Sequence, residues 1–266
     1  MRISLIGYGK MGKEIEKMAK LKGIEIVSII DPTDSSAKSK KITKASLNNA
    51  DVAIDFTTPD AAIGNLKLVS VLGKNMVMGT SAWYDKVEEA KEIVKKNNIG
   101  FIYGPNFSIG VNIYMKIVEE SAKLFDKAKD YDVFVYEEHH NQKVDSPSGT
   151  AKNISDIVLK NVKRKKRAVY DRVNRKILPS ELHVASVRAG SIPGTHVLGF
   201  DSEADTIEIK HTARNRSGFA MGALLAASWI KNKKGFYTFD DLMKDFFNEP
   251  FLSSEERKPS GGKRRK

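Results

Sequence analysis

Cysteine is absent from this 266-residue chain, and so is any run of about 20 apolar residues. The first absence excludes disulfides and thiolate metal sites, and it suits a reducing cytoplasm. The second leads us to expect no membrane span. The amino terminus leads directly into an apolar strand and lacks the pattern of a signal peptide. We therefore expect a cytoplasmic protein, with 41% hydrophobic residues to build a core for one or two domains.

The net charge of +12 is concentrated in two segments. Residues 160–176 contain nine Lys or Arg and one Asp, and residues 253–266 contain six Lys or Arg and two Glu. The second segment mixes its charges with Ser, Pro and Gly and has no periodicity, which predicts a disordered basic tail. The first follows a predicted helix, whose dipole favours cations at its carboxyl end. We interpret it as a solvated basic patch; steering of an anionic substrate ranks second and RNA binding third.

A glycine-rich turn near the amino terminus has the pattern G-x-G-x-x-G, between the strand Ile3–Ile6 and a helical run to about Lys22. In this context Gly7 permits a tight turn, Gly9 lets the backbone approach a pyrophosphate, and Gly12 lets the helix pack closely on the strand. The alternative is a glycine-rich turn in an α/β protein that binds no nucleotide. The residues expected to contact the cofactor here are Gly7, Tyr8, Gly9, Lys10, Met11 and Gly12.

An acidic residue ends the second predicted strand, Glu25–Ile30. This residue, Asp31, comes 19 positions after the last glycine of the turn, close to the spacing of about 20 expected for the carboxylate that binds the adenosine ribose. A carboxylate there accepts hydrogen bonds from the ribose of NADH and repels the 2′-phosphate of NADPH. NADH is therefore favoured. Lys38, Lys40 and Lys41 follow and could attract a phosphate, so NADPH stays open.

Three later segments repeat one pattern, a short apolar strand that ends in small or polar turn residues. They are Val52–Phe56 before Thr57–Pro59, Asn75–Met78 before Gly79–Ser81, and Ile99–Tyr103 before Gly104–Phe107. Helical stretches near Asp60–Leu72 and Tyr84–Asn97 separate them, which predicts a Rossmann-type, doubly wound parallel sheet. Ligands bind beyond the carboxyl ends of such strands. The turns should thus line one crevice through Gly79, Thr80, Ser81, Gly104, Pro105, Asn106 and Phe107.

A cluster of titratable residues lies between the predicted strand Val133–Tyr136 and a predicted helix, Ala151–Leu159. His139, His140 and Lys143 can exchange protons or hold anions. They precede Ser148–Thr150, where the helix begins; free N–H groups and the dipole at a helix start attract anions. The alternative is a capped helix preceded by surface histidines. We interpret the segment as a site that binds an anionic substrate.

The carboxyl half predicts a second domain. Its strands Leu182–Gly190, His196–Phe200 and Thr206–His211 follow one another without helices, which indicates an antiparallel or mixed sheet. The apolar helix Phe219–Ile230 must be buried, against the nucleotide domain. We divide the chain into a dinucleotide-binding domain (1–107 and 217–252), an α+β domain for substrate binding and oligomerisation (108–216), and the basic tail (253–266).

The segment Glu137–Ala151, with the pattern E-x-H-H-x-x-K-x-D-x-P-S-G-T-A, resembles a family signature. It is similar to that of the 4-hydroxy-tetrahydrodipicolinate reductases, also called dihydrodipicolinate reductases, of lysine and diaminopimelate biosynthesis. The resemblance extends from Met1 to about Phe247. Other matching segments are Gly7–Gly12, Asp55–Thr57, Pro105–Gly110, Val187–Gly190 with Gly194 and His196, and His211–Arg216.

The resemblance implies the reduction of a small cyclic dicarboxylate by NADH or NADPH. His139 and Lys143 would donate protons. The residues implied to bind the substrate carboxylates are His140, Lys143, Ser148, Gly149 and Thr150. Arg216 would join the turns at 7–12, 79–81 and 104–107 and Asp31 in binding the cofactor. The family fold implies a homotetramer. Because the sequence shows no metal-ligand spacing, we expect no metal.

One position departs from the family pattern. The family has Gly-Thr-Thr-Gly where this chain has Gly79, Thr80, Ser81 and Ala82. Ser81 keeps the hydroxyl, but Ala82 does not freely adopt a positive φ, so the local loop shape is in question. Two other functions stay open: a related dehydrogenase acting on aspartate or diaminopimelate, and an NAD(P)-binding regulator without catalysis. A regulator should lack the paired proton donors that this chain carries.

Overall fold

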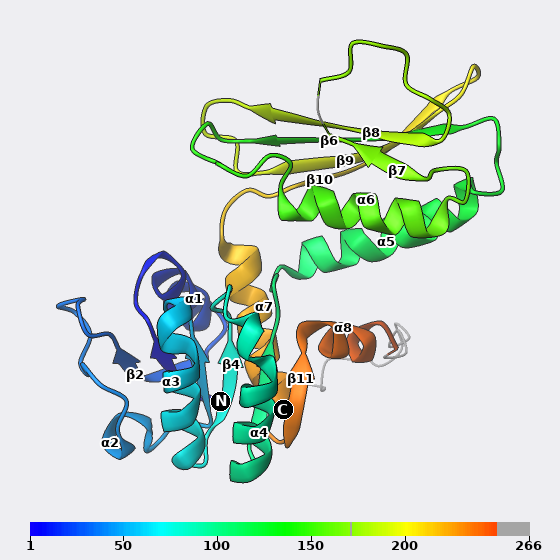
Figure 1. Cartoon of the computed structure of the whole chain (residues 1–266). Helices are drawn as coiled ribbons and strands as arrows, with labels where there is room; N and C mark the ends of the chain where they lie inside the picture. Colours follow the sequence, from blue (N-terminus) through cyan, green and yellow to red (C-terminus); the bar gives the residue numbers. More distant parts are fainter. Residues whose placement is uncertain (171, 249–266) are drawn as a thin grey trace, which may run out of the picture.

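The computed structural model describes residues 1–170 and 172–248, which form two layered parts (Figure 1). The first part is a sheet of parallel strands in the order β11-β5-β4-β3-β1-β2. These strands are β1 (Arg2–Ile6), β2 (Glu25–Ile30), β3 (Val52–Asp55), β4 (Asn75–Met78), β5 (Gly100–Tyr103) and β11 (Gly235–Thr238). Every residue of β3 and β4 is buried, as continuous apolar strands require when helices cover both faces.

Helices cover both faces of this sheet, as predicted. Side chains of α1 (Lys10–Leu21), α7 (Ser217–Ile230) and α8 (Phe239–Asn248) share one hydrophobic core with strands β1 and β3. Side chains of α3 (Pro59–Val71) and α4 (Val87–Asn97) build a second core on the opposite face. Two short helices, α2 (Lys44–Leu47) and the 3₁₀ helix Tyr84–Lys86, complete this part. The sheet is therefore doubly wound, and its carboxyl ends form one edge where turns can meet a ligand.

The second part is a mixed sheet in the order β10-β9-β6-β8-β7. Its strands are β6 (Asp132–His139), β7 (Arg167–Val169), β8 (Glu181–Arg188), β9 (Thr195–Asp201) and β10 (Thr206–Thr212). Strands β6, β7 and β8 are parallel, whereas β9 runs antiparallel to β6 and β10. Helices α5 (Ile109–Phe125) and α6 (Gly149–Asn161) lie on one face (Figure 1). The opposite face carries the half-buried aromatic side chains of Phe134 and Tyr136 and the exposed side chain of Val187.

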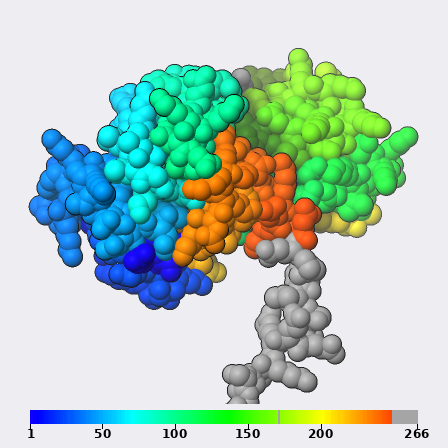
Figure 2. Space-filling view, turned by 90° about the horizontal axis from the view of Figure 1, so that it is seen from below, coloured from blue at the N-terminus to red at the C-terminus, as the bar shows by residue number. Residues whose placement is uncertain are grey.

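The carboxyl-terminal segment returns to the first part. Figure 2 shows α7, β11 and α8 seated between the amino-terminal residues and the mixed-sheet part. Helix α7 is buried against α1 and the parallel sheet, which confirms the prediction from its apolar sequence. Strand β11, which we did not predict, pairs with β5. Residues 249–252 of the predicted first domain and the predicted tail 253–266 lie outside the described residues.

The prediction of a solvated basic patch was wrong for part of residues 160–176. Lys165 is 2% exposed, and its Nζ contacts the Glu181 carbonyl and the Asp132 carboxylate. Arg167 and Arg175 both bind the buried carboxylate of Glu181. These cations hold β7 and the following loop against β8. The sequence did not predict these ion pairs. Asp132 is distant in sequence from Lys165, and Glu181 follows a segment rich in cations.

No helix within residues 1–170 and 172–248 is both long and apolar enough to cross a membrane.

Candidate active site

The glycine-rich turn opens onto a cavity at the carboxyl edge of the parallel sheet. The cavity has a volume of about 740 Å³ and is lined by Gly7, Gly9, Asp31, Thr57 and Asn65 among others. Gly7 has φ +88°, and a Cβ there would lie 2.2 Å from the Phe56 carbonyl oxygen, so only glycine fits. A Cβ on Gly9 would meet open space. The backbone is thus free to approach a ligand at Gly9.

The other residues of this turn divide between the protein interior and the solvent. The Tyr8 hydroxyl donates to Glu16 of α1, so the Tyr8 ring points along the helix. Met11 packs against the hydrophobic core, and Lys10 is exposed. Lys10 is therefore the side chain of this turn that lies in solvent. The turn would contact a ligand chiefly through its backbone.

Asp31 lies at the end of β2 as predicted, and its carboxylate also organises the surrounding loop. It accepts hydrogen bonds from Tyr8 N at 2.8 Å, from Thr33 N at 2.8 Å and from Asp34 N at 2.8 Å. Burial alone would raise the pKa of Asp31, but these hydrogen bonds outweigh it and lower the pKa to about 2. A fixed anion therefore stands in the cavity wall. Lys40 and Lys41 line the same cavity.

A buried carboxylate braces the turn after β4. Asp55, 0% exposed, accepts hydrogen bonds from the hydroxyls of Thr80 and Thr57 and from the amide of Asn65. Burial raises the pKa of Asp55, against the effect of these hydrogen bonds. Because the Thr80 hydroxyl is already engaged and its carbonyl accepts from Trp83 Nε1 at 2.8 Å, this turn offers a ligand its backbone and the exposed Ser81. The described residues that line the cavity do not include Gly79, Thr80 or Ser81, although we predicted that they would.

Ala82 adopts the left-handed conformation, with φ +62°. The hydrogen bonds at Thr80 and Trp83 fix the loop on both sides of this residue. The loop therefore carries backbone strain at Ala82, since a Cβ in this conformation costs about 1 kcal/mol or more.

Replacing Ala82 by Gly is expected to raise the free energy of unfolding by about 0.5 kcal/mol. The free energy recovered by relieving the strain exceeds the entropic cost of folding that glycine adds by giving the unfolded chain more conformations. Urea denaturation measures the change. The control Ala204→Gly, in an exposed turn without positive φ, should be destabilising. Equal losses in both variants would contradict the strain.

The turn after β5 faces two ways. Phe107 is 2% exposed, and its ring packs against Phe56 and Phe239. It belongs to the core, whereas Pro105 is exposed and Asn106 is half-buried. Arg216 is exposed at the start of α7. The described residues that line the cavity include neither 104–107 nor Arg216, so their contacts with a cofactor stay a prediction.

The predicted titratable cluster lies where β6 ends. His139 is the last residue of the strand and is 8% exposed. His140 is half-buried, and its carbonyl accepts Lys143 N at 3.1 Å, which closes a turn. The ammonium group of Lys143 contacts the Asp145 carboxylate at 2.7 Å. The structure thus brings the predicted histidines and lysine together at one end of the mixed sheet.

His139 is neutral at pH 7 in the unliganded chain. Burial is the main cause that lowers its pKa to about 4; the negative charge of Glu137 opposes the shift, and His196, Lys143 and Arg188 add to it. Its Nδ1 lies 3.2 Å from Glu137 Oε2. A Cβ on Gly194 would lie 3.0 Å from its Nε2, so the glycine leaves room beside that nitrogen.

The turn predicted to bind an anion lies at the start of α6. Ser148 caps the helix, since its hydroxyl accepts Ala151 N at 3.2 Å. Gly149 is exposed, and a Cβ there would meet open space, while Thr150 is half-buried. The N–H groups of the first turn are therefore accessible to a carboxylate.

Three residues that matched the family pattern, but to which the sequence assigned no role, support this cluster: Glu137, Arg188 and His196. Glu137 is 0% exposed and binds Arg188 at 2.8 Å, while His196 contacts the Ser148 hydroxyl at 3.1 Å. One signal was present, because strand alternation places Glu137 on the same face as Val133 and Val135. A carboxylate at a core-facing position needs partners.

Glu137, His139 and His196 also have the ligand types of a metal site, with their ligand atoms within 4.8 Å of one another. The sequence did not predict such a site, because His196 is far along the chain from Glu137 and His139. The Arg188 guanidinium already neutralises Glu137, which disfavours a second cation. We therefore keep the expectation that no metal is required.

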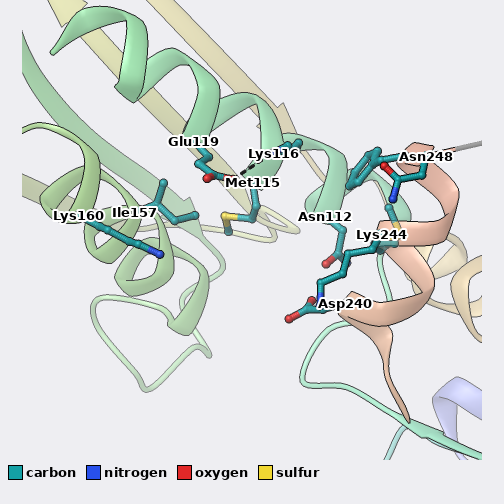
Figure 3. A pocket seen from close by; sticks show the side chains of 11 residues that line it. Asn112, Met115, Lys116, Glu119, Ile157, Lys160, Asp240, Lys244 and Asn248 are labelled. Carbon is teal, nitrogen blue, oxygen red and sulfur yellow. Dashed lines mark hydrogen bonds and ion pairs between the residues drawn. The ribbon is translucent and has the colours of Figure 1, made fainter. Parts of the chain in front are cut away.

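Another hollow, of about 610 Å³, lies where α5 and α6 approach α8 (Figure 3). Its wall includes Met115, Ile157 and Met243, with Lys116 paired to Glu119. Its described lining residues come from these three helices and include no residue of the predicted site.

Comparison with known proteins shows the family of the chain. Residues 1–107 match the family described as dihydrodipicolinate reductase, N-terminus, and residues 110–243 match its C-terminus. The chain belongs to the dihydrodipicolinate reductase family. A 4-hydroxy-tetrahydrodipicolinate reductase of Christiangramia forsetii is 38% identical over 93% of this chain and 99% of its own length. One of Archaeoglobus fulgidus is 36% identical over 92% and 100%.

A solved dihydrodipicolinate reductase from Paenisporosarcina sp. TG-14, with dipicolinate bound, has the same fold. Its TM-score is 0.71 at 24% identity, over 91% of this chain and 99% of that one. An amine dehydrogenase from Mycobacterium smegmatis has a TM-score of 0.58 at 13% identity, over 90% and 95%. These likenesses concern the fold, a doubly wound parallel sheet with a mixed-sheet part, as predicted.

Proposed function

We propose that the chain reduces 4-hydroxy-tetrahydrodipicolinate to tetrahydrodipicolinate with NADH or NADPH, in diaminopimelate and lysine biosynthesis. Membership of the family over both parts of the chain supports the activity. The observation that carries the proposal is the convergence of His139, Lys143 and the start of α6 at one end of β6. A coupled assay with the synthase that makes the substrate tests it. Oxidation of aspartate or diaminopimelate, without reduction of the hydroxy-tetrahydrodipicolinate, would overturn it.

The residues divide the work between binding and proton delivery. Backbone N–H groups of Gly149 and Thr150, the capped turn of Ser148, and the side chain of His140 bind the two substrate carboxylates. Lys143 adds positive charge beside them. When bound, the nicotinamide supplies hydride. Reduction to tetrahydrodipicolinate consumes this hydride and one proton and releases the 4-hydroxyl group as water. His139 and Lys143 would stabilise the negative charge that develops on the substrate ring and deliver the proton.

The cavity fits a dinucleotide cofactor. It combines an open approach at Gly9 with the start of α1 and a fixed carboxylate at Asp31. We propose that the backbone of residues 7–12 holds the pyrophosphate and that Asp31 holds the ribose. The turns 79–81 and 104–107 would bracket the nicotinamide end, with Arg216 nearby.

NADH is expected to bind at least as tightly as NADPH. Asp31 is ionised and would repel a 2′-phosphate, whereas Lys40 and Lys41 in the same cavity wall would attract it. Titration of the unliganded protein with each nucleotide measures the preference. A combined Lys40→Ala and Lys41→Ala variant should weaken NADPH and leave NADH unchanged. A strong preference for NADPH in the parent protein would contradict the carboxylate argument.

Binding of a dicarboxylate is expected to raise the pKa of His139 from about 4 towards neutrality. Burial disfavours the imidazolium in the unliganded chain, and nearby carboxylates favour it. The histidine would therefore gain its proton as substrate binds. NMR titration of labelled histidine, with and without dipicolinate, measures the shift. His183, on β8, is the internal control. An unchanged pKa in the saturated complex would contradict the role of proton donor.

We propose that residues 1–107 and 217–252 form the dinucleotide domain and that residues 108–216 bind substrate and assemble a homotetramer. The face of the mixed sheet opposite α5 and α6, with the exposed Val187 and the half-buried Phe134 and Tyr136, would form the contact. Sedimentation analysis should give the mass of four chains. The cytoplasm, where NADH and NADPH are available, would be the place of action.

A further inference from the structure

Glu137 occupies an unusual place for a carboxylate. It lies on the core-facing side of β6 and is 0% exposed, where an ionised group needs several partners. Its Oε1 accepts hydrogen bonds from Ser148 N at 2.9 Å, Ser186 Oγ at 2.9 Å and Arg188 Nη2 at 2.8 Å. Burial would raise the pKa of Glu137, but the neighbouring His196 ring and the hydrogen bonds from Ser148 and Arg188 outweigh it and lower the pKa below the usual range.

Two of these hydrogen bonds lead to parts of the proposed reaction site. Ser148 begins the helix whose first turn is proposed to bind the substrate carboxylates. Arg188 also donates to the Asp145 carbonyl at 2.7 Å, and the Asp145 carboxylate contacts Lys143 at 2.7 Å. One carboxylate oxygen thus fixes both the anion-binding turn and, through Arg188, the loop that carries Lys143.

The other oxygen faces the histidines. Oε2 lies 3.2 Å from His139 Nδ1 and 3.4 Å from His196 Nε2, and no conventional hydrogen bond reaches it within the described part of the chain. When His139 is protonated on Nδ1, this oxygen can orient the ring and turn Nε2 towards the space beside Gly194. The arrangement resembles a carboxylate that sets the tautomer of a histidine.

We propose that Glu137 is a positioning residue that aligns the proton donors His139 and Lys143 with the carboxylate-binding start of α6. It supplies the negative charge around which Arg188, His139 and His196 gather. This inference rests on the proposed reductase function and deepens it, because it assigns the alignment of donor and anion site to one side chain.

The decisive variant is Glu137→Gln in the full-length chain, which keeps the shape and removes the charge. We expect kcat/KM to fall about 10²-fold or more, with a lower kcat and a higher KM. We also expect the pKa of His139 to fall below its value in the parent protein, since the charge of Glu137 opposes the downward shift. This second readout, by NMR, requires no catalysis and does not follow from a general loss of stability.

Glu181 provides a matched control. It is a buried carboxylate on the same sheet, bound by Arg167 and Arg175 at the opposite end of β8 from Arg188. Glu181→Gln should lower the melting temperature but leave kcat, KM and the titration of His139 unchanged. Glu137→Asp keeps the negative charge but shortens the side chain by one methylene group. In this variant we expect the pKa of His139 to stay close to its value in the parent protein and kcat/KM to fall about tenfold.

The outcomes separate the inference from the function on which it rests. A parent protein without reductase activity in the coupled assay would overturn the proposed function, while the histidine titrations would still test the alignment. Glu137→Gln with normal kcat/KM, or with an unchanged His139 pKa, would overturn the inference. If that variant does not fold, Glu137→Asp decides, and normal kcat/KM there would overturn it as well.

Discussion

Alanine at position 139 or 143 is expected to lower kcat by about 10²-fold or more, the usual loss when a general acid is removed. His139 sits at the end of β6 with its Nδ1 against Glu137, and Lys143 lies on the adjoining turn. Both lie beside the start of α6, where the substrate carboxylates are proposed to bind. Initial rates with saturating cofactor, over a range of substrate concentrations, separate kcat from KM for each variant.

Suitable controls keep the residue type and change the place. His183→Ala lies elsewhere in the mixed sheet, and Lys95→Ala lies near the end of α4. Both should leave kcat within about twofold, as is usual for positions outside a reaction site. Near-normal kcat in both His139→Ala and Lys143→Ala, with the fold intact by circular dichroism, would refute the assignment of proton donors.

A single methyl group on Gly222 is expected to lower the free energy of unfolding by about 3 kcal/mol. A Cβ there would lie 1.7 Å from the carbonyl oxygen of Phe107 and 3.3 Å from the Phe239 ring. The obstacle is backbone, so α7 must move away from the turn after β5. Because that turn is proposed to contact the nicotinamide end, the affinity for NADH should fall as well. Urea denaturation and nucleotide titration measure the two effects.

Gly64 makes a matched control. It lies within α3, and a Cβ there would meet open space. Gly64→Ala should therefore stabilise the protein, by up to about 1 kcal/mol from helix propensity. Equal stability of Gly222→Ala and the parent protein would show that α7 can shift freely, contrary to the close packing described above.

The parallel sheet could be predicted because each of its first five strands is a short apolar run followed by a turn and a helix. The hydrophobic pattern of such a segment is visible within a few consecutive residues, so a single sequence is enough to predict it. Strand β11 escaped prediction because its residues are only half-buried and it joins β5 from far along the chain. Helix α5 was also missed, although Val111, Tyr114, Val118 and Ala122 have helical spacing.

The proposed site shows the same division. The segment 137–151 could be proposed as a site because the predicted proton donors and the predicted anion-binding turn lie within one connection. Arg188 and His196 come to Glu137 from neighbouring strands, and only the strand order places them there. The buried state of Lys165 likewise depends on Asp132 and Glu181, on two other strands. Long-range pairing of charges leaves little trace in a single sequence.

The return of α7 and β11 to the parallel sheet has a consequence for synthesis on the ribosome. Until residue 238 has emerged from the ribosome, one edge of β5 is unpaired. Until α7 has emerged, Ile3, Leu5 and Val52 lack part of their packing, because α7 covers that face of the sheet. The mixed-sheet part is continuous in the chain, between α5 and β10, and emerges complete before then. The segment made second can therefore reach its final structure first, and the nascent amino-terminal half must wait, exposed to chaperones, for its last strand.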